Sequence, residues 1–139
     1  MAHALERFVS AQAPVYAQAL GELRRGRKTG HWMWFVFPQI AGLGRSDTAR
    51  FYAIRDAAEA RAYLAHPLLG PRLIEATRAV TAATGSAEAV LGGIDAVKLR
   101  SSMTLFAAVA EDAAPFVAAL DRFYDGVRDA ATLAILDRS

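Results

Sequence analysis

Apolar residues recur along the chain with the period of an α-helix, and glycine or proline interrupts them at short intervals. The clearest stripe has apolar residues three and four positions apart: Tyr16, Ala19, Leu20 and Leu23. Gly26 follows where this helix would end. Helices are also predicted around 5–9 and over 47–52, 56–65, 86–91 and 95–110. Three more are predicted to begin at 70, 115 and 129. The pattern predicts an all-α fold, a single compact multihelical domain over residues 1–139.

Residues 29–39, TGHWMWFVFPQ, follow no clear period because they are short and almost uniformly apolar. A short buried helix starting at Thr29 and a buried extended strand are both compatible with them. Helical neighbours favour the helix, and Pro38 ends the element in either case. The fold class therefore allows one minor extended segment near 31–37.

Composition narrows the class of protein. The chain has 139 residues, of which 54% are hydrophobic, and it has no cysteine. A domain of this size needs no disulfide or metal to hold its core. No apolar run reaches the about 18 residues of a membrane span, and the N-terminus lacks the pattern of a signal peptide. We therefore expect a cytoplasmic protein without membrane contact, and the sequence leaves its oligomeric state open.

Charge argues against a specific nucleic-acid partner. The net charge is only +2, and acidic and basic residues are mixed along the chain. The one dense basic run consists of Arg24, Arg25, Arg27 and Lys28. The three histidines show no metal-ligand spacing, so we expect no metal and no cofactor.

The predicted helix 95–110 carries polar residues beside its apolar face. On a helical wheel, one stripe is formed by Leu99, Met103 and Phe106. Lys98 and Ser102 fall beside this stripe, within about 60° of Asp95. The opposite face is expected to be solvated, and it carries Arg100, Thr104 and Glu111.

A lysine and an aspartate that face a core need partners, because an unpaired buried charge is costly. In a structural interpretation, Asp95 caps its helix, Lys98 pairs with it, and Ser102 donates to the carbonyl of Lys98. In a functional interpretation, Asp95 and Lys98 are catalytic, and Ser101 and Ser102 bind a ligand. Both interpretations remain open at this point.

The aromatic segment is the second candidate for a site. Trp32 and Trp34 fill a core by default, but their indole nitrogens need partners when buried. Their flat faces, beside Gln39, also suit stacking against a base or a sugar ring. His31 is the candidate proton carrier, and Lys28 the candidate group to attract phosphate.

Several strings carry a family resemblance. The most specific is HWMWFVFPQ at 31–39, and GRK (26–28), GLG (42–44), HPLLG (66–70) and SSMTLF (101–106) accompany it. Together they resemble a bacterial family of unknown function, DUF1810, often automatically labelled "calpastatin". The resemblance implies a compact multihelical fold and no established activity. Calpain inhibitors of that name are disordered, whereas this composition is typical of a globular domain.

Two function hypotheses follow, and neither decides whether the protein is an enzyme. In the first, a pocket between 31–39 and the helix 95–106 binds a small molecule such as a nucleotide or an ADP-ribose-like ligand. Small helical NADAR proteins, which process ADP-ribose linkages, are a loose analogy without a matching motif. In the second, the domain is a non-catalytic interaction or structural module. Both predict that 31–39 packs against the helix carrying Asp95, Lys98 and Ser102.

Overall fold

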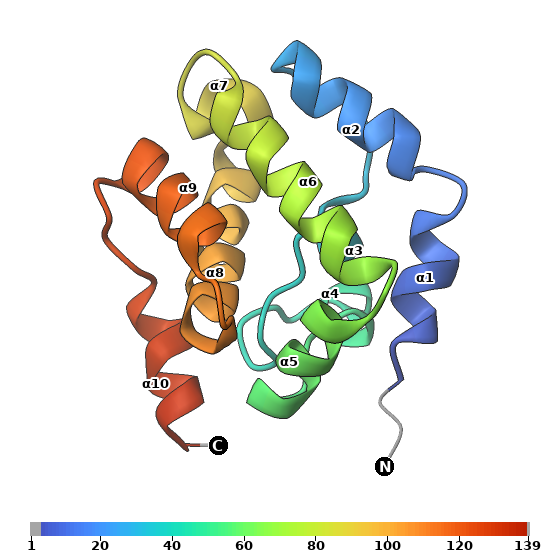
Figure 1. The fold of residues 1–139 in the computed structure, drawn as a ribbon, viewed down its shortest axis with the longest axis vertical. Coiled ribbons are helices and arrows are strands. Elements are labelled where there is room, and N and C mark those ends of the chain that lie inside the picture. The colour runs from blue at the N-terminus through green and yellow to red at the C-terminus, as the bar shows by residue number, and fades with distance from the viewer. Residues whose placement is uncertain (1–3, 139) are drawn as a thin grey trace.

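The computed structural model describes residues 4–138, and within them the chain forms ten helices (Figure 1). They are α1 (Glu6–Gln12), α2 (Tyr16–Arg25), α3 (Met33–Val36), α4 (Asp47–Phe51), α5 (Ala57–Ala65), α6 (Leu69–Ala82), α7 (Ala87–Leu91), α8 (Gly93–Val109), α9 (Ala114–Tyr124) and α10 (Ala130–Arg138). The described residues contain no strand, and their extended pairing is limited to one bridge between Ile40 and Ile54. The predicted all-α class is confirmed.

The long helix α8 forms the centre of the fold. It packs against α5, α7, α9 and α10, and Figure 1 shows it behind α9 and α6. Every residue from 101 to 107 is buried, so the helix has no single wet face in this stretch. The expectation of a solvated Thr104 is therefore wrong. Its hydroxyl accepts a hydrogen bond from the backbone N–H of Asp129, at 2.9 Å, where the chain enters α10.

An aromatic chain crosses the core from α1 to α9. Phe8 meets Tyr63 edge to face, with ring centroids 5.1 Å apart. Tyr63 lies 5.5 Å from Phe106 of α8, which lies 5.9 Å from Phe116. Burying side chains of this size contributes about 2–3 kcal/mol each, so the chain links four helices into one core.

Most of the predicted helix ends are confirmed. Gly26 ends α2 with a φ of 74°, a left-handed conformation that glycine adopts without a steric penalty. Asp56 and Ser86 cap α5 and α7, and Asp129 accepts a hydrogen bond from the N–H of Thr132 in the first turn of α10. The prediction for Asp95 is wrong, because α8 begins two residues earlier and its N-cap is Gly92. The Asp95 carboxylate is instead engaged by two lysines.

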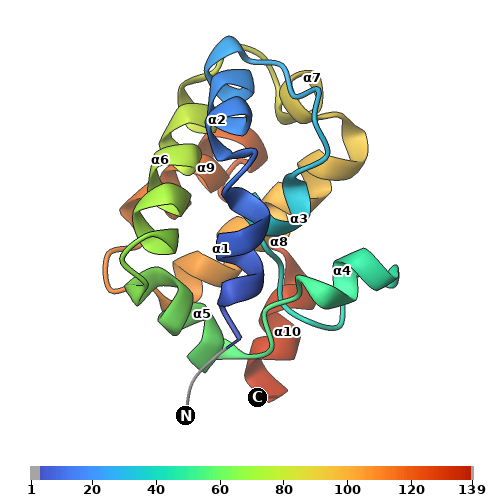
Figure 2. The ribbon, with the colours of Figure 1, turned by 90° about the vertical axis from the view of Figure 1, so that its right-hand side faces the viewer.

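Residues 29–39 are helical over a shorter range than predicted. The helix α3 spans only Met33–Val36, and Figure 2 shows it in front of α8. The backbone N–H groups of Thr29 and Gly30 donate to the carboxylate of Glu22 in α2. These two residues are thus held in a loop, which explains why the helix does not start at Thr29. Residues 33–36 are helical, so the alternative of an extended strand is not observed there.

A second buried carboxylate, Glu59 of α5, ties the N-terminal helix to the fold. Its Oε1 accepts from Arg7 Nη2 at 2.8 Å, and its Oε2 accepts from Arg55 Nη2 at 3.1 Å. Arg7 also donates to the carbonyls of Phe51 and Ala53. One guanidinium therefore joins α1 to α5 and to the chain that follows α4.

Candidate functional site

A hollow of about 330 Å³ lies where the loop before α3 meets the start of α8. Lys28, His31, Met33 and Trp34 line one side, and residues 91–95 line the other. The backbone N–H of Lys28 donates to the carbonyl of Val90 at 2.8 Å, which fixes the loop beside α7. The predicted meeting of the aromatic segment with the helix of Asp95 and Lys98 is therefore observed.

Alternating charges connect the two sides of this hollow. The ammonium of Lys28 lies 2.8 Å from Asp95 Oδ2, and that of Lys98 lies 3.5 Å from Asp95 Oδ1. Lys28 also donates to the carbonyl of Gly30 at 2.6 Å and lies 5.1 Å from the centre of a Trp32 ring. Lys98 lies 5.1 Å from the centre of a Trp34 ring, which adds a cation–π contact. Asp95 is thus held in place from both sides.

Glu22 supports the hollow from inside the core. Its side chain is fully buried, and its Oε1 accepts from the N–H groups of Thr29 at 2.7 Å and Gly30 at 2.8 Å and from Trp32 Nε1 at 3.0 Å. Its Oε2 accepts from Gln18 Nε2 at 2.8 Å. Burial alone would raise the pKa of this carboxyl, but the hydrogen bonds outweigh burial and lower it to about 2. Glu22 therefore fixes the loop as an ionised anchor.

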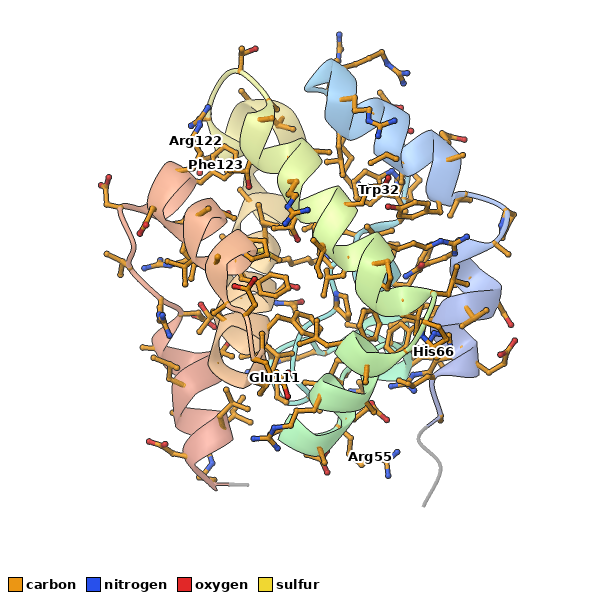
Figure 3. All side chains as sticks on the ribbon, viewed as in Figure 1. Trp32, Arg55, His66, Glu111, Arg122 and Phe123 are labelled. Carbon is orange, nitrogen blue, oxygen red and sulfur yellow. The ribbon has the colours of Figure 1, made fainter. Side chains whose placement is uncertain are left out.

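The loop geometry also depends on Gly30. A Cβ at this position would lie 2.9 Å from Cδ1 of Trp32 and 3.2 Å from Nε2 of Gln18. Trp32 is almost fully buried, and Figure 3 shows it between the ribbons of α2 and α6. The indole is thus a packed element that helps to fix the loop.

The first turn of α8 is open toward the hollow. Gly92 has a φ of 88°, and a Cβ added at Gly92 or Gly93 would meet nothing within 4 Å. No side chain caps this helix end, so its first N–H groups have no side-chain acceptor within residues 4–138. Such N–H groups and the helix dipole favour a negatively charged or acceptor group nearby, and Asp95 in this first turn already provides one carboxylate.

Five of the nine predicted site residues gather here. Lys28, His31, Trp34 and Asp95 line the hollow, and Lys98 contacts two of them. His31 is exposed and has no hydrogen bond or ion pair within the described chain. The i, i+3 pairing of Lys98 with Asp95 is confirmed, whereas a role of these residues in binding or catalysis stays a prediction.

The other four predicted residues face elsewhere. Trp32 donates its indole N–H to Glu22. Gln39 lines a much smaller cavity on the other side of Trp34. Ser101 donates to Asp129 Oδ2 at 3.0 Å and so contacts the start of α10. The expected bond from Ser102 to Lys98 is absent, and Ser102 Oγ is the one buried side-chain polar atom of the described residues without a hydrogen-bond partner.

Sequence reasoning missed Glu22 and the glycine pair. Glu22 borders the apolar stripe of α2, one turn after Gln18, and its charge places it on a wet face by default. The signal that could have found it is the need of Trp32 for an acceptor. The fold provides this acceptor on α2.

The described residues contain neither a metal-ligand cluster nor a membrane span. Among residues 4–138, no group of three or more His, Asp or Glu side chains could hold a metal ion. None of the helices in the same range is long and apolar enough to cross a membrane.

Comparison with known proteins places the chain in a family without assigning an activity. The chain is similar to the conserved hypothetical protein Rv1873 from Mycobacterium tuberculosis, whose crystal structure superposes with a TM-score of 0.94. The two are 54% identical, and the match covers 96% of each chain. No curated protein matches it. A family model described as "Protein of unknown function (DUF1810)" matches residues 2–136, and the chain belongs to this family.

Proposed function

We propose that the hollow beside α8 binds a small molecule of the nucleotide or ADP-ribose type. The observation that carries the proposal is the open space above Gly92 and Gly93, which faces Trp34, His31 and Asp95. A volume of about 330 Å³ lies at the small end of the range for ligand pockets. Flat, charged ligands of moderate size suit such a site.

Each part of such a ligand has a complementary group in the hollow. The partly exposed ring of Trp34 offers an apolar face for a base. The N–H groups at the start of α8 offer donors for a phosphate, and the glycines leave room for its approach. Lys28 is a weaker phosphate ligand than its sequence suggests, because Asp95 and the Gly30 carbonyl already occupy its ammonium.

The hollow also holds groups that transfer protons. His31 is exposed at the rim of the hollow, and an imidazole can donate or accept a proton. Asp95 lies across from it in the same lining. If a bound ligand is turned over, His31 is the candidate general acid or base, and Asp95 is the candidate orienting group.

The test is binding of ADP-ribose and AMP, measured by calorimetry and thermal shift. Gly93→Leu places a large side chain in the hollow at a helical position where glycine is unfavourable, so it should preserve the fold and abolish binding. Ala130→Leu makes a similar change at the exposed first residue of α10 and should leave binding unchanged. Equal binding by wild type and Gly93→Leu would place the ligand elsewhere.

A non-catalytic interaction module is the second candidate. Two large apolar side chains beside the hollow are exposed, Ile94 at 76% and Val97 at 65%. Exposed apolar residues of this kind are typical of protein contacts when they cluster. If the protein binds neither AMP nor ADP-ribose and instead self-associates or binds a partner through Ile94 and Val97, the module is favoured.

A further inference from the structure

We infer that Asp95 accepts a hydrogen bond from a neutral donor group of the ligand, an amine or a hydroxyl. The inference rests on the proposed function and specifies which part of the ligand meets Asp95.

The first step is that the lysines are already occupied. An ammonium has three donors. That of Lys28 lies 2.8 Å from Asp95 and 2.6 Å from the Gly30 carbonyl, with a Trp32 ring beside it, and its side chain is only 9% exposed. Lys98 lies outside the lining and stacks on Trp34. Lys28 lines the hollow as well, but these contacts engage its ammonium, so the charged group that remains for a ligand is the carboxylate of Asp95.

The second step is the unused capacity of that carboxylate. Two carboxylate oxygens offer about four acceptor positions, and each oxygen of Asp95 faces one lysine. The side chain is 18% exposed and lines the hollow, so acceptor positions remain within reach of a ligand. An ionised carboxylate cannot donate, so its complement is an N–H or O–H group.

The third step is the position of Asp95 between two cations. The two lysines restrain the carboxylate, so little ordering is needed when a donor binds.

In an adenine nucleotide, two groups provide such neutral donors: the amine of the base and the hydroxyls of the ribose. Three probes distinguish them. AMP carries both groups, purine riboside 5′-monophosphate lacks only the amine, and 2′,3′-dideoxyadenosine 5′-monophosphate lacks only the hydroxyls. Binding of each to the full chain is measured by calorimetry.

We expect one of the two analogues to bind wild type at least tenfold more weakly than AMP, because a hydrogen bond to a charged group is lost. Asp95→Asn should weaken AMP binding and remove the difference between AMP and that analogue. Asp137→Asn, a matched change at an exposed aspartate near the end of α10, should leave both values unchanged. The wild-type comparison of the analogues does not depend on the folding of any variant.

The outcomes separate this inference from the proposed function. If all three probes bind wild type equally, or if Asp95→Asn binds AMP more tightly, the inference is wrong and the binding site stands. If neither AMP nor ADP-ribose binds wild type, the proposed function fails and the inference fails with it.

Discussion

Two fully buried glutamates stabilise this fold in different ways. Glu59 is bound by the guanidinium groups of Arg7 and Arg55, so opposite charges face its carboxylate. Glu22 is bound by four N–H groups, and each of them belongs to a neutral group. The contacts of Glu59 join two helices and a connecting chain, whereas those of Glu22 hold one loop around a single acceptor. A buried carboxylate can therefore be held by charge or by the number of its hydrogen bonds.

The largest effect is expected for Glu22→Ala. Truncation leaves the N–H groups of Thr29 and Gly30, which are partly buried, and the buried indole of Trp32 without their acceptor, at about 1–3 kcal/mol for a buried donor and less for a partly buried one. We expect a loss of about 5 kcal/mol in the free energy of unfolding, measured with urea. Glu111→Ala, at an exposed glutamate, is the matched control and should cost less than about 0.5 kcal/mol. A small loss for Glu22→Ala would mean that water replaces the carboxylate.

Glu59→Gln should cost about 4 kcal/mol, because breaking a buried ion pair leaves the charge of Arg7 uncompensated. Because the partner of Glu59 is the side chain of Arg7, a second substitution that removes the charge of Arg7 should recover part of the lost stability. In the double variant Arg7→Met with Glu59→Gln, we expect a destabilisation about 2 kcal/mol smaller than the sum of the single variants. Chemical denaturation of all four proteins measures this coupling. Strict additivity would show that the charge pair contributes nothing.

Acid should weaken the fold through Glu22. Its pKa is about 2 in the folded chain and has an ordinary value of 4.5, so its stabilisation is present above about pH 4.5 and is lost as the pH falls toward 2. The difference amounts to about 3 kcal/mol. Glu22→Gln resembles the protonated state, so it should cost about 3 kcal/mol at pH 7 and almost nothing near pH 2. Urea unfolding at pH 7, 4 and 3 tests this convergence, and a constant gap between the two proteins would contradict it.

The same contrast explains what the sequence could predict. The helices were predictable because their stripes and their caps, such as Ser86 and Asp129, are local signals. Arg55 precedes Glu59 by four residues, so the contact between these two side chains could also be predicted from local spacing. Two of the four partners of Glu22 are backbone N–H groups of a loop, which no residue type marks. The other two are the side chains of Gln18 and Trp32.

Part of the candidate site was also predictable, because some of its contacts follow from local spacing in the sequence. Asp95 and Lys98 share one helix face, so their pairing followed from spacing. The helical wheel failed for Thr104, because it assumes one wet face and α8 is surrounded by other helices. Ser101 is turned toward α10 for the same reason. The contribution of Gly92 and Gly93 depends on space that only the folded chain defines.

The smallest effect is expected for Gln18→Ala. Gln18 supplies one of the four donors of Glu22, and it does so from an exposed position on α2, one turn earlier. Water can reach that position and replace its amide, so we expect a loss of about 1 kcal/mol or less. The three donors to Oε1 remain, so the loop and the hollow should keep their geometry. Calorimetric unfolding and the binding of AMP are the measurements. A loss as large as that of Glu22→Gln would show that Oε2, and not the three-fold contact at Oε1, holds the anchor.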